Sequence, residues 1–467
     1  MTPTLREMEM LKTFAAVSAA ALAVAGAARA DLRADVAADY AHLEALYEDF
    51  HANPELSFKE SRSAARMAAE FEAAGFEVTT GLGDAWTKAK AKADAGAVLD
   101  GVGGYGVVGV LRNGEGPTVM IRADMDALPL EEKSGVAYAS RARGVDYLGT
   151  EAPVMHACGH DVHMTALIGA ARRLAAMKDQ WSGTLVLLAQ PAEELGLGAL
   201  AVLDDGLYRR FPRPDYNIAL HVNGTDPAGS VAYTPGYALA AVDTVDIVVK
   251  GVGGHGAVPH LAKDPIVVAA QIVTALQTLV SRELDPLDSG VVTVGALNAG
   301  FKHNIIPDEA RLKITIRSYK DDVRKKLRDG VARIARAQAL SAGLPEALAP
   351  EVTYEEDTLV ATYNDPALTV RVAAALARQL GEARVYETPP VMGGEDFAYF
   401  SRQDPAVPSF IFWLGGGDPK AVAAARAGKG PIPPSNHSPF FAPVPEPTLK
   451  TGVEALTAAA LDLFSGE

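Results

Sequence analysis

The chain has 467 residues, of which 49% are hydrophobic and 22% are charged. This is a globular composition, which excludes a disordered, collagen-like or coiled-coil protein, and the length predicts roughly two or three domains. With 43 basic and 58 acidic residues the formal net charge is −15, so the surface repels phosphate backbones and we expect no nucleic-acid partner. The single cysteine, Cys158, excludes an intramolecular disulfide.

The first thirty residues have the layout of a secretory signal peptide. Lys12 precedes an apolar, alanine-rich run, and Ala28-Arg29-Ala30 fits a small-x-small cleavage site before Asp31. The run is shorter than the roughly 20 residues that cross a bilayer. We therefore expect cleavage near Ala30/Asp31 and a soluble, periplasmic or secreted protein with no membrane partner. An uncleaved anchor and a mis-assigned start codon are the alternatives.

The segments that follow predict an α/β domain. Helical patterns cover residues 39–50, 61–74 and 162–177, and strand patterns cover residues 107–111, 118–123, 184–189 and 217–222. Such alternation predicts a mostly parallel central sheet flanked by helices. Between these segments lies an alanine- and glycine-rich stretch that carries Lys88, Lys90 and Lys92. We expect a solvated surface loop there; a basic binding patch is the alternative.

The pattern changes near Ala241. Strands are predicted at 244–250, 290–296, 310–318 and 351–354, and helices at 265–279 and 321–341. The order β-α-β-β-α-β is that of the ferredoxin-like α+β unit, so we predict an inserted domain at 240–355. A helix at 366–380, a strand at 409–414 and a helix at 446–464 then resume the first pattern. The catalytic domain is therefore predicted in two parts, 31–239 and 356–467.

Polar residues collect after several of the predicted strands, and the densest group surrounds Cys158. Residues 155–163 read MHACGHDVH, just before a predicted helix. In the loop that leads into this helix, Cys158 and His160 could converge on one metal ion, because thiolate and imidazole are common ligands of zinc and similar metals. A Cys-His nucleophile and a structurally buried thiol are the alternatives.

An adjacent acidic pair, Glu193-Glu194, follows the strand at 184–189. Such a pair is usually loop surface. Near a metal the two carboxylates could divide the work, one binding the ion and the other accepting a proton from water whose pKa the metal lowers to about 7.

Residues 101–106, GVGGYG, match the G-x-G-x-x-G spacing of dinucleotide-binding loops. That fingerprint requires a strand before it and a helix after it. Here a loop precedes the glycines and a strand follows them, so we expect neither a nicotinamide nor a flavin.

Motifs in a fixed order run along nearly all of the mature chain. They are RADMDALP at 122–129, MHACGHDVHMTALIGAA at 155–171, QPAEE at 190–194, GGHGAVPH at 253–260, NIIPDEA at 304–310, MGGEDFAYF at 392–400 and NHSP at 436–439. As a set they resemble the M20 metallopeptidase family, and more closely its amidohydrolase branch of hippurate hydrolases, aminoacylases, N-acetyldiaminopimelate deacetylases and indole-acetyl-amino-acid hydrolases.

The resemblance implies a di-metal hydrolase that cleaves the amide of an N-acyl amino acid or of a short peptide with a free C-terminal carboxylate. It implies a general base, Glu193, and an acidic residue, Asp126, that supports the site without binding metal. The implied ions are two divalent metals, manganese or zinc, with cobalt and nickel as alternatives. The ligands it implies are Cys158, His160, Glu194, His221 and His437.

The resemblance also assigns roles to the inserted domain, which acts in the family as a lid and mediates homodimerisation. His255 matches a histidine that reaches the partner subunit's site and stabilises the oxyanion. Asn304 and Arg317 match residues that hold the substrate carboxylate, a task that suits the guanidinium fork. His156, His163 and His260, by contrast, are expected to be structural, and so is the turn at 393–396.

The chain departs from the family pattern at 84–100 and at 144–154, which puts the choice of substrate in doubt. A non-catalytic periplasmic protein that binds a metal or ligand on the same fold is the alternative function. A hydrolase that uses Cys158 as its nucleophile is a third hypothesis.

Overall fold

The structure, a computed structural model, describes residues 32–466 and divides into two compact units. Unit 1 comprises residues 32–233, 366–388 and 407–466. Unit 2 comprises residues 234–365 and 389–406. The predicted signal peptide, residues 1–30, lies outside the described residues.

Unit 1 is built on an eight-stranded sheet in the order β1-β2-β6-β3-β7-β18-β8-β17. At its centre β6, β3, β7 and β18 pair in parallel, whereas β1 and β2 add an antiparallel edge. The strands are β1 (Glu77–Leu82), β2 (Gly106–Asn113), β3 (Thr118–Asp124), β6 (Gly183–Gln190), β7 (Tyr216–Pro227), β8 (Val231–Tyr233), β17 (Val385–Glu387) and β18 (Ser409–Gly417). The predicted mostly parallel sheet is confirmed, and its central strands are nearly continuous apolar runs because helices cover both faces.

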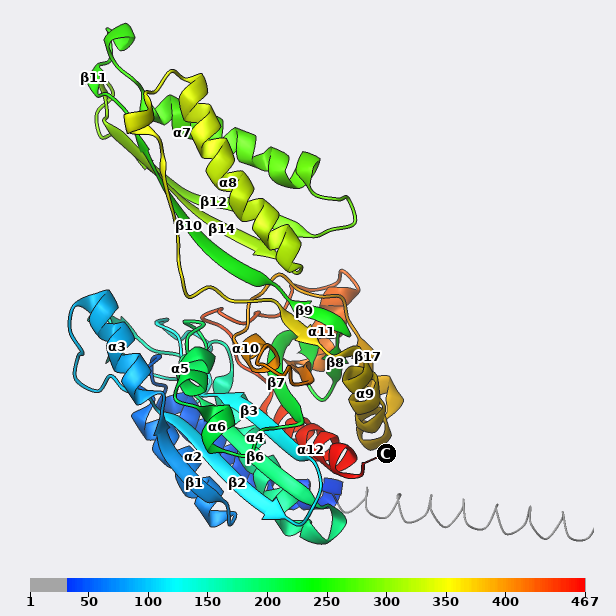
Figure 1. The fold of residues 1–467 in the computed structure, drawn as a ribbon. Helices are drawn as coiled ribbons and strands as arrows, with labels where there is room; N and C mark the ends of the chain where they lie inside the picture. The colour runs from blue at the N-terminus through cyan, green and yellow to red at the C-terminus, as the bar shows by residue number, and fades with distance from the viewer. Residues whose placement is uncertain (1–31, 467) are drawn as a thin grey trace, which may run out of the picture. The chain divides into compact units, whose positions relative to one another are not determined.

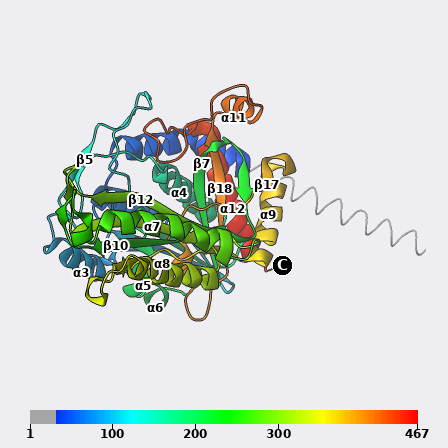
Figure 2. The ribbon, with the colours of Figure 1, turned by 90° about the horizontal axis from the view of Figure 1, so that it is seen from above.

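The helices of unit 1 include a segment at 32–52, α2 (Ser61–Ala73), α3 (Asp84–Ala95), α4 (His160–Ala176), α5 (Gly198–Asp204), α6 (Leu207–Arg210), α9 (Pro366–Leu380), α11 (Pro419–Arg426) and α12 (Pro445–Phe464). Helix α4 packs against α12 as well as against β3 and β7, and β7 and β18 run side by side next to these helices (Figure 2). Contact on several sides explains why α4 is buried nearly all round. A short hairpin joins β4 (Arg143–Val145) to β5 (Glu151–Pro153).

Unit 2 has the predicted β-α-β-β-α-β order, which confirms the ferredoxin-like α+β fold. Its elements are β10 (Ala241–Lys250), α7 (Pro265–Thr278), β12 (Gly290–Ala299), β14 (Glu309–Ser318), α8 (Asp321–Ser341) and β15 (Glu351–Tyr354). The antiparallel sheet runs β12-β14-β10-β15, and α7 and α8 lie on one of its faces (Figure 1). Small two-stranded ladders join β11 (Gly254–His255) to β13 (Ile305–Ile306) and β9 (Gly236–Leu239) to β16 (Thr362–Asn364).

The lysine-rich stretch forms helix α3. The prediction of a solvated loop is therefore wrong for residues 84–95. Lys88 pairs with Asp84 and Lys90 with Asp94, each four residues apart. Such pairs and the high alanine content favour a helix. The inner side of α3 is buried at Ala91, so the stretch packs on unit 1.

The glycines at 101–106 lead into strand β2, as the sequence predicted. The loop packs so closely that a side chain at Gly104 would lie 2.1 Å from the backbone nitrogen of Asp84. The packing of the loop therefore requires glycine at position 104.

Among the described residues, one helical stretch, Pro265–Glu283, is long and apolar enough to cross a membrane by length and composition alone. One helix of this kind is weak evidence for a membrane span. A third of its most apolar window is buried, and Val268 and Ile272 belong to the core of unit 2. Its outer side exposes Val267 and Val280 to solvent.

Candidate metal centre

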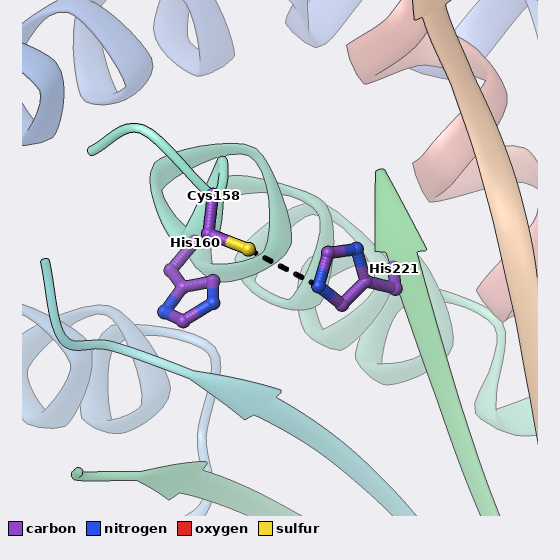
Figure 3. A group of neighbouring side chains, drawn as sticks. All are labelled: Cys158, His160 and His221. Carbon is purple, nitrogen blue, oxygen red and sulfur yellow. Dashed lines mark hydrogen bonds between the residues drawn. The ribbon is translucent and has the colours of Figure 1, made fainter. Parts of the chain in front are cut away.

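The single cysteine lies where three segments of unit 1 meet. Cys158 is in the turn that precedes α4, His221 is in β7, and His437 is in the loop before α12. Sγ of Cys158 is 3.4 Å from Nε2 of His221 and 3.2 Å from Nε2 of His437. Figure 3 shows the thiol directed at the His221 ring, with His160 beside it at the start of α4. The fold thus gathers residues that are far apart in the sequence.

The loop that carries His437 is held in place by its neighbour. The Asn436 amide donates to the carbonyl oxygens of Cys158 and Val222 at 3.0 and 2.9 Å. The backbone N–H of His437 donates to the carbonyl oxygen of Ala157 at 2.8 Å. His437 itself has a φ of 66°, in the left-handed region that few residues other than glycine adopt. These bonds fix an unusual backbone that directs the imidazole at Cys158.

His160 is the first residue of α4 and is fully buried. Its Nδ1 lies 3.3 Å from Oδ1 of Asp126, and its Nε2 lies 3.7 Å from Oε2 of Glu193. The Asp126 carboxylate also accepts the backbone N–H groups of Glu193 and Glu194, each at 3.0 Å, and the hydroxyl of Ser57 at 2.6 Å. Asp126 therefore orients the His160 ring and the acidic pair together, as carboxylates behind metal-binding histidines do.

Two buried atoms that face this space make no hydrogen bond. They are Nε2 of His160 and Oε1 of Glu194, and they lie 3.9 Å apart. Buried polar atoms are almost always paired, and two ligands on one divalent ion, each about 2.0–2.3 Å from it, can lie this far apart. The residues present therefore fit a metal.

The candidate ligand atoms form two overlapping groups that share Cys158. One group is Cys158, His160 and His221, and the other is Cys158, Glu194 and His437. Within each group the ligand atoms lie within 4.8 Å of one another. Soft thiolate, imidazole and carboxylate suit zinc and other first-row divalent metals. The structure thus brings together all five residues to which the resemblance assigns metal binding, in an arrangement that fits two ions.

His163 is placed beside this cluster, but both its ring nitrogens are in use. Nδ1 lies 2.5 Å from Oδ1 of Asp124, and Nε2 accepts the backbone N–H of Val222 at 2.8 Å. Arg122 donates to the other oxygen of Asp124 at 2.6 Å. His163 has no lone pair left for a metal, so its role is to join α4 to β3 and β7.

His156 and His260, the other two histidines that the sequence analysis expects to be structural, differ in their surroundings. His156 is buried, neither of its ring nitrogens makes a hydrogen bond, and burial lowers its pKa to about 4. It therefore stays neutral near pH 7. His260 is exposed in unit 2.

The electrostatics of the cluster oppose a free thiolate. Burial, followed by the carboxylates of Glu194, Glu193 and Asp124, raises the pKa of Cys158 well above its ordinary value. A nucleophilic cysteine requires a depressed pKa, whereas a coordinating cation stabilises the thiolate directly. This argues against the hypothesis of a cysteine hydrolase.

The two buried histidines of the cluster differ in charge. Burial lowers the pKa of His221 to about 4, and its Nδ1 lies 2.8 Å from the carbonyl oxygen of Val222, which leaves Nε2 as the acceptor. Burial also opposes the charged form of His160, but Asp124 and Asp126 raise its pKa to about 10. His160 would therefore have to lose the proton on Nε2 in order to hold a metal there.

Unit 2 carries the three residues assigned to the lid. His255 is exposed in β11, its Nδ1 accepts the N–H of Ala257, and the carbonyl of Asn304 accepts the N–H of Gly256. His255 and Asn304 are therefore neighbours. Arg317 is half-buried near the end of β14, where it donates to the carbonyl oxygen of Met392 at 3.0 Å.

Arg317 and His255 lie at opposite ends of unit 2. Arg317 pairs with Val242 at the start of β10, whereas Glu309 pairs with Lys250 at its end, next to the β11–β13 ladder. Arg317 is eight residue steps from Glu309 along β14, which is about 27 Å at the rise of a strand. The structure therefore does not bring Arg317 together with His255 and Asn304 within one chain.

Sequence reasoning missed the residues of the turn before α2. Ser57 bonds Asp126, and the buried Glu60 bonds the backbone of Ala192 at 2.8 Å. His51, also buried, lies 2.6 Å from Asp161. The only signal in the sequence was a cluster of polar residues within HANPELSFKE at 51–60, which reads equally well as an ordinary helix break.

The fold and the cluster together define a class of protein. A Cys-His-Glu group at the carboxyl edge of a parallel sheet, with an acidic pair beside it, is the arrangement of a metal-dependent hydrolase.

Comparison with known proteins gives the family. The sequence model of peptidase family M20/M25/M40 matches residues 120–461 of this chain. Thermostable carboxypeptidase 2 of Saccharolobus solfataricus is 37% identical over 414 residues, covering 88% of this chain and 92% of that protein. Hippurate hydrolase of Campylobacter jejuni is 35% identical over 373 residues, covering 79% and 87%. The chain belongs to peptidase family M20/M25/M40, whose members are hydrolytic enzymes, and it fits the amidohydrolase branch.

A solved structure agrees with this assignment. The YXEP protein of Bacillus subtilis, described as a dinuclear metal-binding peptidase of the M20 family, matches with a TM-score of 0.69 and 26% identity. The match covers 92% of this chain and 99% of that chain.

Proposed function

We propose that this protein hydrolyses the amide bond of N-acyl amino acids, or of short peptides with a free C-terminal carboxylate. The observation that carries the proposal is the cluster of Cys158, His160, Glu194, His221 and His437, with its buried unpaired ligand atoms. Two divalent ions in this cluster would supply a nucleophile from water near neutral pH and would polarise the scissile carbonyl. We propose manganese or zinc, with cobalt and nickel as alternatives.

Glu193 is the proposed general base. Its carboxylate lies 3.7 Å from Nε2 of His160, and its backbone is held by Asp126. From there it would accept a proton from the attacking water and pass it to the leaving nitrogen. Glu194, the next residue, would be left to bind metal.

Two observations support the proposed substrate class: the positively charged side chain of Arg317 in unit 2 and the names of related proteins. Arg317 offers a half-buried guanidinium whose pKa burial lowers, and a fork of this kind suits a carboxylate. We assign it, with Asn304, to the free carboxylate of the substrate. Relatives named hippurate hydrolase and N-acetyldiaminopimelate deacetylase support an acylated amino acid as the substrate class.

We further propose a homodimer formed through unit 2. Strand β12 is an edge strand, and α7 exposes apolar side chains such as Val267; both features favour a protein interface. Arg317 and the β11–β13 ladder that carries His255 lie at opposite ends of unit 2, and this separation also favours a site that is shared between subunits. The partner subunit would then supply His255 for the oxyanion and Asn304 for the substrate carboxylate.

The proposed location is the periplasm or the extracellular medium, from the leader at residues 1–30. Cell fractionation of the native chain, with N-terminal sequencing of the product, tests this. We expect a mature N-terminus near Asp31. Recovery of the full-length chain in the cytoplasm would contradict it.

A substrate panel tests the function. The metal-loaded protein is assayed on N-acyl amino acids, on dipeptides, and on the same acyl amino acids with the carboxylate blocked as a methyl amide. We expect hydrolysis of the free acids that chelator abolishes, and a loss of kcat/KM on blocking. Binding of these compounds without turnover would support the alternative of a non-catalytic binding protein.

A further inference from the structure

Two residues with left-handed backbone share one hydrogen-bond acceptor in unit 1. Phe58 has a φ of 63° and Ala192 a φ of 52°, values that are uncommon for residues other than glycine. Their backbone N–H groups both donate to Oε1 of Glu60, at 2.9 and 2.8 Å. The Glu60 side chain is fully buried, so these bonds form away from water, where hydrogen bonds are stronger.

The Glu60 carboxyl does not serve the helix that it precedes. Glu60 is the N-cap residue of α2, but its side chain makes no capping bond. Glu55 supplies that function, because it accepts the backbone N–H groups of Arg62 and Ser63 at 2.9 and 2.7 Å. Capping is the ordinary structural role of a polar side chain at a helix start. The contact of Glu60 with Ala192, 132 residues away, therefore has another purpose.

Ala192 directly precedes the two glutamates of the candidate metal centre. The N–H groups of Glu193 and Glu194 bind Asp126, so two buried carboxyl groups hold three successive N–H groups of this loop. Glu60 holds the residue at which the backbone turns. Release of Ala192 from its left-handed conformation would rotate the next peptide and displace both glutamates, and a displacement of about 1 Å can reduce a rate about 10²-fold.

We propose that Glu60 is a positioning residue for the amidohydrolase reaction and that it acts by holding Ala192 in its left-handed conformation. The inference rests on the proposed function, because it concerns the placement of Glu193 and Glu194. Glu60 touches neither the substrate nor the metal; it acts through the backbone of the loop.

The second oxygen of Glu60 indicates which substitution preserves this role. Oε2 makes no hydrogen bond, and burial, followed by the nearby Asp126, raises the pKa of Glu60 well above its ordinary range. A neutral carboxyl group and a glutamine amide present the same acceptor oxygen in nearly the same shape. Glutamine at position 60 can therefore accept both N–H groups, whereas alanine can accept neither.

Apolar side chains cover the two hydrogen bonds. Phe58 and Ala192 belong to one buried cluster. The Phe58 ring centroid lies 6.5 Å from that of Trp86 in α3 and 5.6 Å from that of Tyr147. The two segments in which the chain departs from the family pattern, 84–100 and 144–154, thus both pack on the residues that Glu60 holds and keep water from them.

The test compares E60Q, E60A and the double variant E60A/A192G. Metal affinity is measured by titrating Mn²⁺ or Zn²⁺ into the stripped proteins, and kcat and KM are measured with an N-acyl amino acid. For E60A we expect kcat or metal affinity to fall roughly 10- to 100-fold, with KM little changed. We expect E60Q to retain most of the activity, and A192G to restore part of what E60A loses, because glycine adopts positive φ without strain.

A matched control is E454A, which removes another buried carboxylate, one that contacts Arg33 and Gln379. It should lower thermal stability without changing kcat or metal affinity. If E60A does not fold, E60D, which shortens the side chain, takes its place. Wild-type kcat and metal affinity in E60A, or no rescue by A192G, would overturn the proposal. If the wild type hydrolyses no substrate, the proposed function fails, and the metal titration still decides the role of Glu60.

Discussion

Sγ of Cys158 lies 3.4 Å from Nε2 of His221, although 63 residues separate them in the chain. The contact arises because the turn before α4 and the strand β7 reach the same edge of the unit 1 sheet. In an open parallel sheet, ligands bind at this edge. We therefore treat the thiol as the shared member of the metal cluster.

Replacement of Cys158 by serine should weaken metal binding. A serine hydroxyl is not deprotonated near neutral pH and is a poorer ligand than a thiolate for zinc-like metals. We expect metal affinity to fall at least about tenfold, measured by elemental analysis after dialysis against a weak chelator. Unchanged metal content in C158S would contradict the ligand assignment.

Substitutions at Glu193 and Glu194 should have different effects, because we propose that Glu193 is the general base and Glu194 a metal ligand. We expect E193Q to keep its metal and lose roughly 10²–10⁴-fold in kcat, the usual contribution of a general base. E194Q should bind metal more weakly, and its activity should fall as a consequence. The two variants serve as controls for each other, because they differ by one position in the same loop. Full turnover by E193Q, or equal metal loss in both, would show that the roles are assigned wrongly.

Complementation tests whether sites are shared between subunits. The E193A and H255A chains should each be nearly inactive alone. When they are mixed under conditions that exchange subunits, half of the dimers are mixed, and each mixed dimer holds one intact site. We expect about one quarter of wild-type activity per chain. A mixture no more active than its components would mean that His255 does not act on the partner's site.

The main features of the fold could be predicted from the sequence, because periodicity reports burial. The apolar strand at 217–222 and the alternating strand at 244–250 predicted different kinds of sheet, and both are present as β7 and β10. The glycines around the Lys88 stretch predict a loop, but residues 84–95 form helix α3. Its alanines and its lysine–aspartate pairs at a spacing of four residues decided the structure instead.

The candidate site could be predicted only where motifs concentrate its residues. Cys158 and His160 stand out in one short segment. Glu60 and Ser57 do not, because they act through single hydrogen bonds to residues far away in the chain. A single sequence contains no pattern that predicts such a hydrogen bond. The positive φ of Ala192 cannot be predicted either, because alanine is not a residue type that favours this conformation.

The buried His51 should make stability depend on pH. It lies 2.6 Å from Asp161 and 3.0 Å from Glu132, against the rings of Tyr47 and Tyr138. Burial alone would lower its pKa, but the two carboxylates raise it to about 10. Since the folded value lies above the unfolded value of about 6.5, this stabilisation is complete below pH 6.5 and is lost as the pH rises through 10.

The variant H51Q should remove that dependence. We expect it to destabilise the protein by roughly 3–5 kcal/mol near pH 7, since it leaves two buried carboxylates without their cation. The difference in stability between wild type and H51Q should shrink as the pH rises to 10, measured by denaturant unfolding. The control H42Q removes a more exposed histidine beside Glu70 and should cost less than about 1 kcal/mol. A difference that stays constant with pH would refute the charge assignment.

A metal titration of the stripped protein tests the central claim most directly. Hydrolysis of an N-acyl amino acid is measured as Mn²⁺ or Zn²⁺ is added in known equivalents per chain. If the cluster around Cys158 is a di-metal hydrolase site, the stripped protein is inactive and the rate rises to a plateau at about two equivalents. Full activity of the stripped protein, with no response to added metal, would contradict the account.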